Sequence, residues 1–252
     1  MRKYVVADAG HSFVRRTTAS LFTPGATRYR RSLYPSDIVD EADAVELARL
    51  HNLTDRVSRM YTFGLRDGRH VVTVQDLKAI AGRIRSVNPD FVLAHIASNE
   101  IANMSGDLST SQWKSQIHDL IKECQDFADE FPADITVCFM DVVPRIKTRG
   151  INLSPERFNE YAKFYNYHMT RLHRRSVSGD DKVHPGLRFS KARGWRYADV
   201  PGQGNAVERP LDYMVGRDDI HPSLSTLRTA YSRCMQRAIT EYQNIPARLR
   251  RC

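Results

Sequence analysis

Short apolar runs alternate with longer stretches of helical spacing along this chain of 252 residues. The apolar runs predict strands at 4–7, 56–63, 91–97, 135–140 and 183–189. The spacing of apolar positions elsewhere predicts helices at 39–50, 74–87, 111–131, 155–175 and 222–242. Repeated strand–helix units favour an α/β fold of three layers, in which helices cover both faces of a central, mostly parallel five-stranded sheet.

Ligands of parallel α/β sheets bind at the carboxyl ends of the strands. We therefore look for function in the loops that follow Ala7, Phe63, Ala97 and Met140. No internal repeat, low-complexity tract or linker divides the chain, so we expect a single domain over residues 1–252 that ends in a basic tail at 244–252.

Composition narrows the class of protein. Hydrophobic residues at 41% and charged residues at 27% are ordinary globular values, which exclude a mainly disordered or collagen-like chain. No apolar run approaches the roughly 18 residues of a membrane span, and the N-terminal segment lacks the apolar core of a secretory signal. We expect an intracellular protein. The four cysteines form no C-x-x-C pair and lie near no histidine cluster, so we expect no metal site and no cofactor.

The first candidate for chemistry follows the first strand, at Gly10-His11-Ser12. A serine hydroxyl at the start of a helix lies among backbone N–H groups and at the positive end of the helix dipole, which suits a nucleophile. The alternative is that Ser12 only caps the helix.

Two further candidates are an amide and a glycine. Asn99 follows the strand at 91–97, where its side chain can donate a hydrogen bond to a developing oxyanion. Gly68 follows the strand at 56–63, where the lack of a side chain lets a backbone N–H approach a ligand. The alternative for both residues is an ordinary turn.

A third motif precedes the last predicted helix. Asp218 and His221 are three residues apart, so the carboxylate can hold Nδ1–H of the imidazole and leave Nε2 as a base. The alternative is a helix cap beside an exposed histidine.

In this order, these motifs resemble the four blocks of the SGNH (GDSL-type) hydrolase superfamily. The first block, Gly-Asp-Ser, corresponds to residues 10–12, and the second, a glycine, to Gly68 or alternatively Gly64. The third, Gly-x-Asn-Asp, corresponds to residues 97–100, and the last, Asp-x-x-His, is matched in full by residues 218–221. The resemblance covers nearly the whole chain. It is closest to divergent SGNH-like domains of animal genomes, some of them carried by retroelements.

Three positions depart from the family pattern. His11 stands where the family has Asp, and Ala97 and Glu100 stand where it has Gly and Asp around Asn99. None of these changes removes a catalytic group that the resemblance implies, but a small shift in geometry costs large factors in rate.

The resemblance implies a flavodoxin-like fold and ester hydrolysis through an acyl-enzyme. Ser12 would be the nucleophile, His221 the general base and then acid, and Asp218 the residue that orients it. The oxyanion would be held by the backbone N–H groups of Ser12 and Gly68 and by the Asn99 amide. Two rival hypotheses remain open: a catalytically weak SGNH-like domain that binds nucleic acid, and an assembly domain of a larger polyprotein.

The net charge of +9 is distributed unevenly. Segment 1–34 carries seven basic and one acidic residues and segment 145–217 carries 15 and seven, whereas segment 35–144 carries ten and 18. One hypothesis is a solvated surface of uneven charge. The sharper hypothesis is a positive rim beside the active site, suited to an anionic ester, a phospholipid surface or a nucleic acid.

Overall fold

The structure is a computed structural model, and it describes residues 3–22, 37–66, 69–143, 153–190 and 232–243. Its centre is a five-stranded sheet in the order β2-β1-β5-β6-β7, in which every pair of neighbours is parallel. The strands are β1 (Tyr4–Gly10), β2 (Val57–Phe63), β5 (Phe91–His95), β6 (Thr136–Met140) and β7 (Leu187–Ser190). The predicted sheet is confirmed, and all of its five strands pair in parallel.

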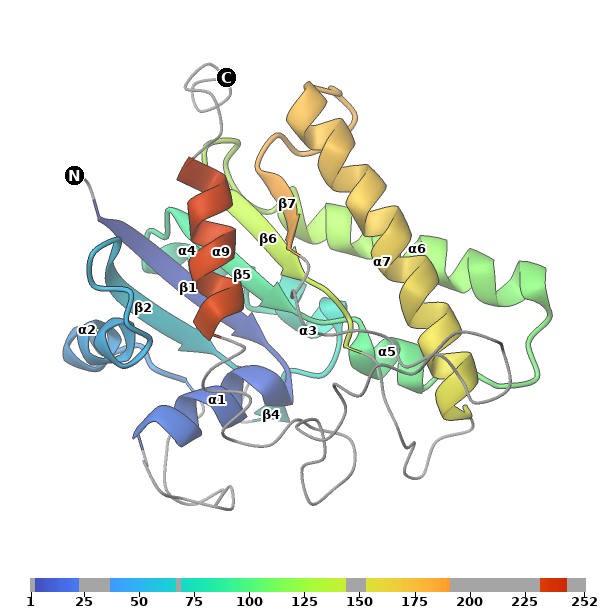
Figure 1. Cartoon of the computed structure of the whole chain (residues 1–252), viewed down its shortest axis with the longest axis horizontal. Helices are drawn as coiled ribbons and strands as arrows, with labels where there is room; N and C mark the ends of the chain where they lie inside the picture. The colour runs from blue at the N-terminus through green and yellow to red at the C-terminus, as the bar shows by residue number, and fades with distance from the viewer. Residues whose placement is uncertain (1–2, 23–36, 67–68, 144–152, 191–231, 244–252) are drawn as a thin grey trace.

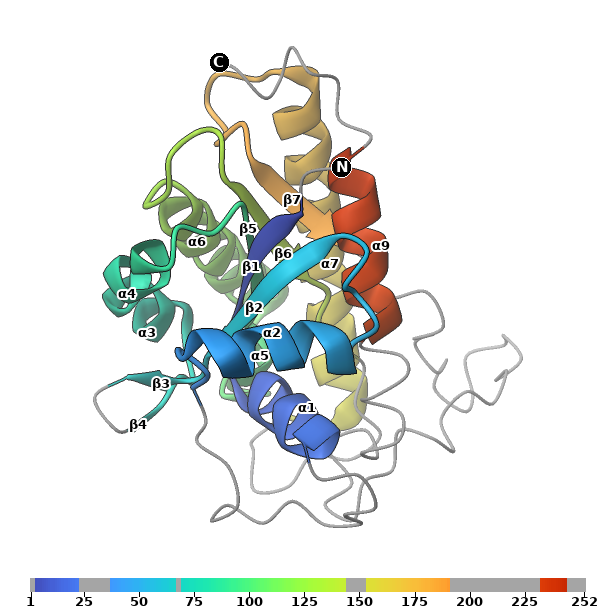
Figure 2. The ribbon, with the colours of Figure 1, turned by 90° about the vertical axis from the view of Figure 1, so that its left-hand side faces the viewer.

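Helices connect the strands and cover the sheet on both sides. They are α1 (Ser12–Phe22), α2 (Glu41–Leu50), α3 (Val74–Ala79), α4 (Ala81–Ser86), α5 (Ser98–Ala102), α6 (Thr110–Ala128), α7 (Pro155–Ser178) and α9 (Ser232–Gln243). Helix α6 contacts both α3 and α7. In Figure 2, α4 and α6 lie on one side of the sheet and α9 lies on the other.

Strand order explains this division into layers. From β1 the chain crosses in one direction to β2, and from β2 it crosses back past β1 to β5 and onward (Figure 1). Because parallel crossovers are right-handed, a reversal of direction moves the connecting helices to the opposite face. The reversal lies between β1 and β5.

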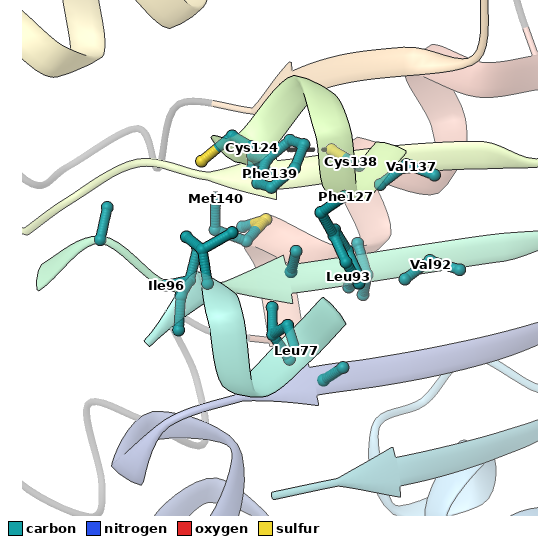
Figure 3. Packing of buried hydrophobic residues seen from close by; sticks show 14 of the residues in the cluster. Leu77, Val92, Leu93, Ile96, Cys124, Phe127, Val137, Cys138, Phe139 and Met140 are labelled. Carbon is teal, nitrogen blue, oxygen red and sulfur yellow. Dashed lines mark hydrogen bonds between the residues drawn. The ribbon is translucent and has the colours of Figure 1, made fainter. Parts of the chain in front are cut away.

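The core forms where alternate strand residues meet amphipathic helices. Val92 pairs with Val137 in the sheet, and Phe139 lies on the same face two residues further along β6. Figure 3 shows these strand residues beside Leu77 of α3 and Phe127 of α6. The Phe127 and Phe139 rings are 6.1 Å apart, centroid to centroid. All five side chains are buried, so this packing fixes α3 and α6 on the sheet.

Sequence signals located the long helices well. Helix α6 begins with a capping box between Ser109 and Gln112, and Ser154 caps α7 with Pro155 in its first turn. Helix α7 ends at Ser178 and is capped by Gly179, whose φ of 82° is the left-handed conformation that suits glycine.

Several details differ from the sequence prediction. Strand β7 begins at Leu187 and not at residue 183. The predicted helix at 74–87 is two short helices that meet at Ile80. The sequence does not reveal this break, because both halves continue one buried apolar stripe and the periodicity is not interrupted. Strand β5 ends at His95 and not at 97, because Ala97 adopts a left-handed backbone (φ 75°). An unpredicted antiparallel hairpin, β3 (Leu65–Arg66) and β4 (Arg69–His70), follows β2.

None of the described helices has the length and apolar character needed to cross a membrane. The predicted last helix agrees with the structure over Ser232–Gln243, and its first part, 222–231, lies outside the described residues.

Candidate active site

The reversal between β1 and β5 brings two of the candidate residues to neighbouring strand ends. The last paired residues of these strands are Gly10 and His95. Ser12 begins α1 directly after β1, and Asn99 lies in the first turn of α5, directly after β5. In a sheet of this order, the switch point between these two strands is the place where ligands bind.

A tight contact with β5 shapes the turn that presents Ser12. Gly10 has a φ of 148°, and a Cβ at this position would collide with the carbonyl oxygen of His95. The next residue, His11, donates its backbone N–H to the same oxygen at 3.1 Å. The turn therefore requires glycine, and it leaves Ser12 half-buried at the start of α1.

Beneath this turn lies a buried polar cluster that the sequence motifs did not reveal. His95 Nε2 is 3.2 Å from Asp8 Oδ1, and both side chains are almost fully buried. His51, at the end of α2, is also buried, which lowers its pKa to about 4, although the nearby Asp8 carboxylate opposes this shift. His11 is buried as well, in the place where the family pattern has Asp. The one available sequence signal was Asp8, which interrupts the first apolar run.

Asn99 is held by a neighbouring loop. Its Nδ2 donates to the carbonyl oxygen of Val72, between β4 and α3, at 3.2 Å. An Asn side-chain amide has two N–H groups, so this bond leaves one for another acceptor. Ala97 precedes this turn in the left-handed conformation, which explains why the family pattern has glycine there.

Glu100 binds the same loop. Its Oε1 accepts the backbone N–H of Val74 at 2.7 Å, while its buried Oε2 has no hydrogen-bond partner in the described part of the chain. The pKa of this carboxyl is raised to about 7, mainly by burial and to a smaller extent by the carboxylates of Glu123 and Asp76, while the backbone hydrogen bonds lower it. Sequence reasoning noted Glu100 only as a departure from the family pattern.

The other candidate residues cannot be placed. Gly68, Asp218 and His221 lie outside the described residues, although the two strands that flank Gly68, β3 and β4, are described. Gly64, the alternative to Gly68, donates its N–H to Asp37 Oδ1, so this N–H is already engaged. Among the described residues, no group of three or more His, Cys, Asp and Glu is arranged to hold a metal ion.

Comparisons with known proteins identify the fold. No family model matches the sequence, and a search of curated proteins finds no match. Solved structures do match. A lipase from a goat rumen metagenome is 13% identical with a TM-score of 0.53, and the match covers 94% of this chain and 97% of the lipase. The chain has the three-layer α/β fold of this lipase, as the resemblance to SGNH hydrolases implied.

Two more solved structures agree with this fold. The acetylxylan esterase Axe2 from Geobacillus stearothermophilus is 12% identical with a TM-score of 0.50, and 94% of each chain is covered. A gut microbial diltiazem-metabolizing enzyme is 16% identical with a TM-score of 0.55, and this chain, 95% covered, spans 47% of it. Identities this low bear on the fold and leave the reaction to be argued from the site. The closer resemblance to retroelement-associated domains finds no support in the comparisons.

Proposed function

We propose that this protein is a serine hydrolase that cleaves acyl esters. The observation that carries the proposal is the placement of Ser12 and Asn99 at the switch point of the sheet, each at the start of a helix that follows one of two adjacent strands. A nucleophile and an oxyanion donor need this proximity. The likeness in fold to a lipase and an acetylxylan esterase supports the same class of reaction.

In this proposal, Ser12 Oγ attacks the acyl carbon of the ester while its proton passes to Nε2 of His221. Asp218 holds the imidazole through Nδ1–H and stabilises the imidazolium. The C–O bond to the alcohol then breaks, and the leaving oxygen takes the proton from His221. A water molecule repeats the sequence on the acyl-enzyme, which releases the acid and restores Ser12.

The negative charge that develops on the carbonyl oxygen needs preorganised donors. The proposed donors are the backbone N–H groups of Ser12 and Gly68 and the second N–H of the Asn99 amide. The N–H of Ser12 lies at the start of α1, at the positive end of the helix dipole, where a developing negative charge is stabilised. One such donor contributes about 3 kcal/mol of transition-state stabilisation in other enzymes.

The direct test replaces the nucleophile. We expect Ser12→Ala to abolish turnover across a panel of acyl esters of increasing chain length, and to abolish covalent labelling by an organophosphonate serine probe, while the protein stays folded. Ser109→Ala is the matched control, because Ser109 caps α6 and so tests whether loss of a helix cap is enough to reduce activity.

Each outcome is decisive for the nucleophile. Equal turnover by Ser12→Ala and the wild type would show that the assignment is wrong. A wild-type protein that neither labels nor turns over any ester of the panel would favour the rival hypotheses, a domain that binds nucleic acid or serves in assembly.

A further inference from the structure

Two hydrogen bonds join α5 to the segment between β4 and α3. Asn99 donates to the carbonyl oxygen of Val72, and Glu100 accepts the N–H of Val74. Two adjacent side chains of α5 therefore bind the backbone of one short segment, the first by donating a hydrogen bond and the second by accepting one. We call residues 72–74 the bridged segment.

The bridged segment is also fixed from its other side. Asp76 Oδ2 accepts the backbone N–H groups of Val72 and Thr73, each at 3.0 Å. Directly before the segment, Val71 donates its N–H to the carbonyl oxygen of Gly64 at 2.9 Å, at the base of the β3–β4 hairpin. The segment thus links Asn99 to the base of the β3–β4 hairpin.

The surroundings of Glu100 are unfavourable for a carboxylate. Asp76 on α3 and Glu123 on α6 are the charged groups that act on it, and both are acidic. Glu100 also acts electrostatically on Cys124 and Tyr165, a buried pair with Sγ and the phenol oxygen 3.4 Å apart. A neutral acceptor would cap the Val74 N–H without the cost of burying a charge. The geometry at Val74 therefore requires from residue 100 an acceptor oxygen of this reach, and not a charge.

We infer that Glu100 is a positioning residue for the oxyanion hole. By accepting the Val74 N–H it holds the bridged segment, and the segment in turn holds the Asn99 amide through Val72 and fixes the base of the β3–β4 hairpin. The inference rests on the proposed ester hydrolase function. Glu100 itself touches no reacting atom.

The side chain must reach Val74, which sets the expected order of variants. Gln keeps an oxygen at the same length, Asp is one methylene shorter, and Ala has no acceptor. A displaced oxyanion donor weakens binding of the transition state and leaves binding of the ester unchanged, so the effect falls on kcat and not on KM.

The first experiment is steady-state hydrolysis of a short-chain 4-nitrophenyl ester. We expect Glu100→Ala and Glu100→Asp to lower kcat by roughly ten-fold to a hundred-fold with little change in KM, and Glu100→Gln to retain most of the activity. Asp40→Ala is the control, because Asp40 caps α2 in the same way away from the bridge. A Glu100→Ala variant with the kcat of the wild type, or a loss confined to KM, would overturn the inference.

The second experiment does not depend on activity. The amide resonance of Val74 is followed by NMR in ¹⁵N-labelled Ser12→Ala protein as the pH is changed. It should shift with a midpoint near the Glu100 pKa of about 7. In the double variant that also carries Glu100→Gln, this transition should be lost. An unchanged Val74 titration after that substitution would refute the hydrogen bond itself. Failure of the proposed function is recognised separately. If Ser12→Ala keeps full turnover, the proposed function is wrong, whereas the Val74 titration still tests the hydrogen bond to Glu100.

Discussion

At the scale of single residues, burial of Glu100 makes stability depend on pH. Its folded pKa of about 7 lies above the ordinary carboxyl value of 4.5. The cost of ionising it in the fold is therefore absent below about pH 4.5 and grows as pH rises to about 7, where it reaches about 3 kcal/mol. We expect Glu100→Gln to unfold with the same free energy as the wild type near pH 4.5 and to be more stable at pH 8.

Chemical denaturation across this pH range measures the effect. Glu46→Gln is the control, because Glu46 is an exposed carboxyl whose pKa is lowered by its hydrogen bond to Arg49. That variant should show no gain in stability between pH 5 and 8. A constant difference between Glu100→Gln and the wild type at every pH would contradict the raised pKa.

His51 has the opposite effect on the wild type. Its folded pKa of about 4 lies below the ordinary histidine value of 6.5, because burial disfavours the charged imidazole. Its contribution is therefore lost as pH falls from about 6.5 to about 4. Between pH 4.5 and 6.5 the two groups act against each other, so the Glu100 effect is best resolved by comparing variants and not from the wild-type curve alone.

At the scale of elements, the turn from β1 into α1 depends on one glycine. Gly10 combines a φ of 148° with a backbone contact that leaves no room for Cβ. We expect Gly10→Ala to destabilise the fold by about 2 kcal/mol or more, through strain and through displacement of His95. It should also lower kcat for the ester in protein that is still folded, because Ser12 lies only two residues after Gly10.

Thermal unfolding combined with kcat checks this prediction. Gly82→Ala is a suitable control, because Gly82 lies within α4 and a Cβ there meets only the end of the Arg85 side chain, at 4.0 Å. That substitution should stabilise the helix slightly. An equally stable Gly10→Ala variant would mean that the turn can accept a side chain.

The same scale shows what sequence can and cannot predict. Helices α6 and α7 were predictable because an apolar stripe, a capping serine and a clear stop coincide in each. Strands β3 and β4 are two residues each, too short to show alternation. The Asp8–His95 pair was not predictable either, because it joins two strands whose adjacency follows only from the topology.

At the scale of the molecule, topology unites candidate residues that are 87 positions apart in the sequence. Ser12 and Asn99 were predicted at strand ends, and the strand order puts those ends side by side. The roles of Asp218, His221 and Gly68 stay predictions, since these residues lie outside the described part of the chain. A family pattern alone located them.

The uneven distribution of charge along the chain leads to the last prediction, which concerns the substrate. Segments 1–34 and 145–217 are strongly basic, the first contains Ser12, and the second leads to Asp218 and His221. If they form a positive rim, KM for an anionic ester should rise several-fold between ~50 and ~200 mM salt, because salt screens exposed charges. KM for a neutral acetate ester should not change.

Charge reversal tests the same rim. Arg145→Glu with Lys147→Glu should raise KM for the anionic ester and leave turnover of the neutral one unchanged. The matched control is Arg49→Glu with Lys122→Glu, an equal change of charge at exposed sites of the acidic segment. If both pairs raise KM equally, only the net charge of the chain matters. If neither does, the basic segments are a solvated surface, and the acyl group alone must account for recognition of the substrate.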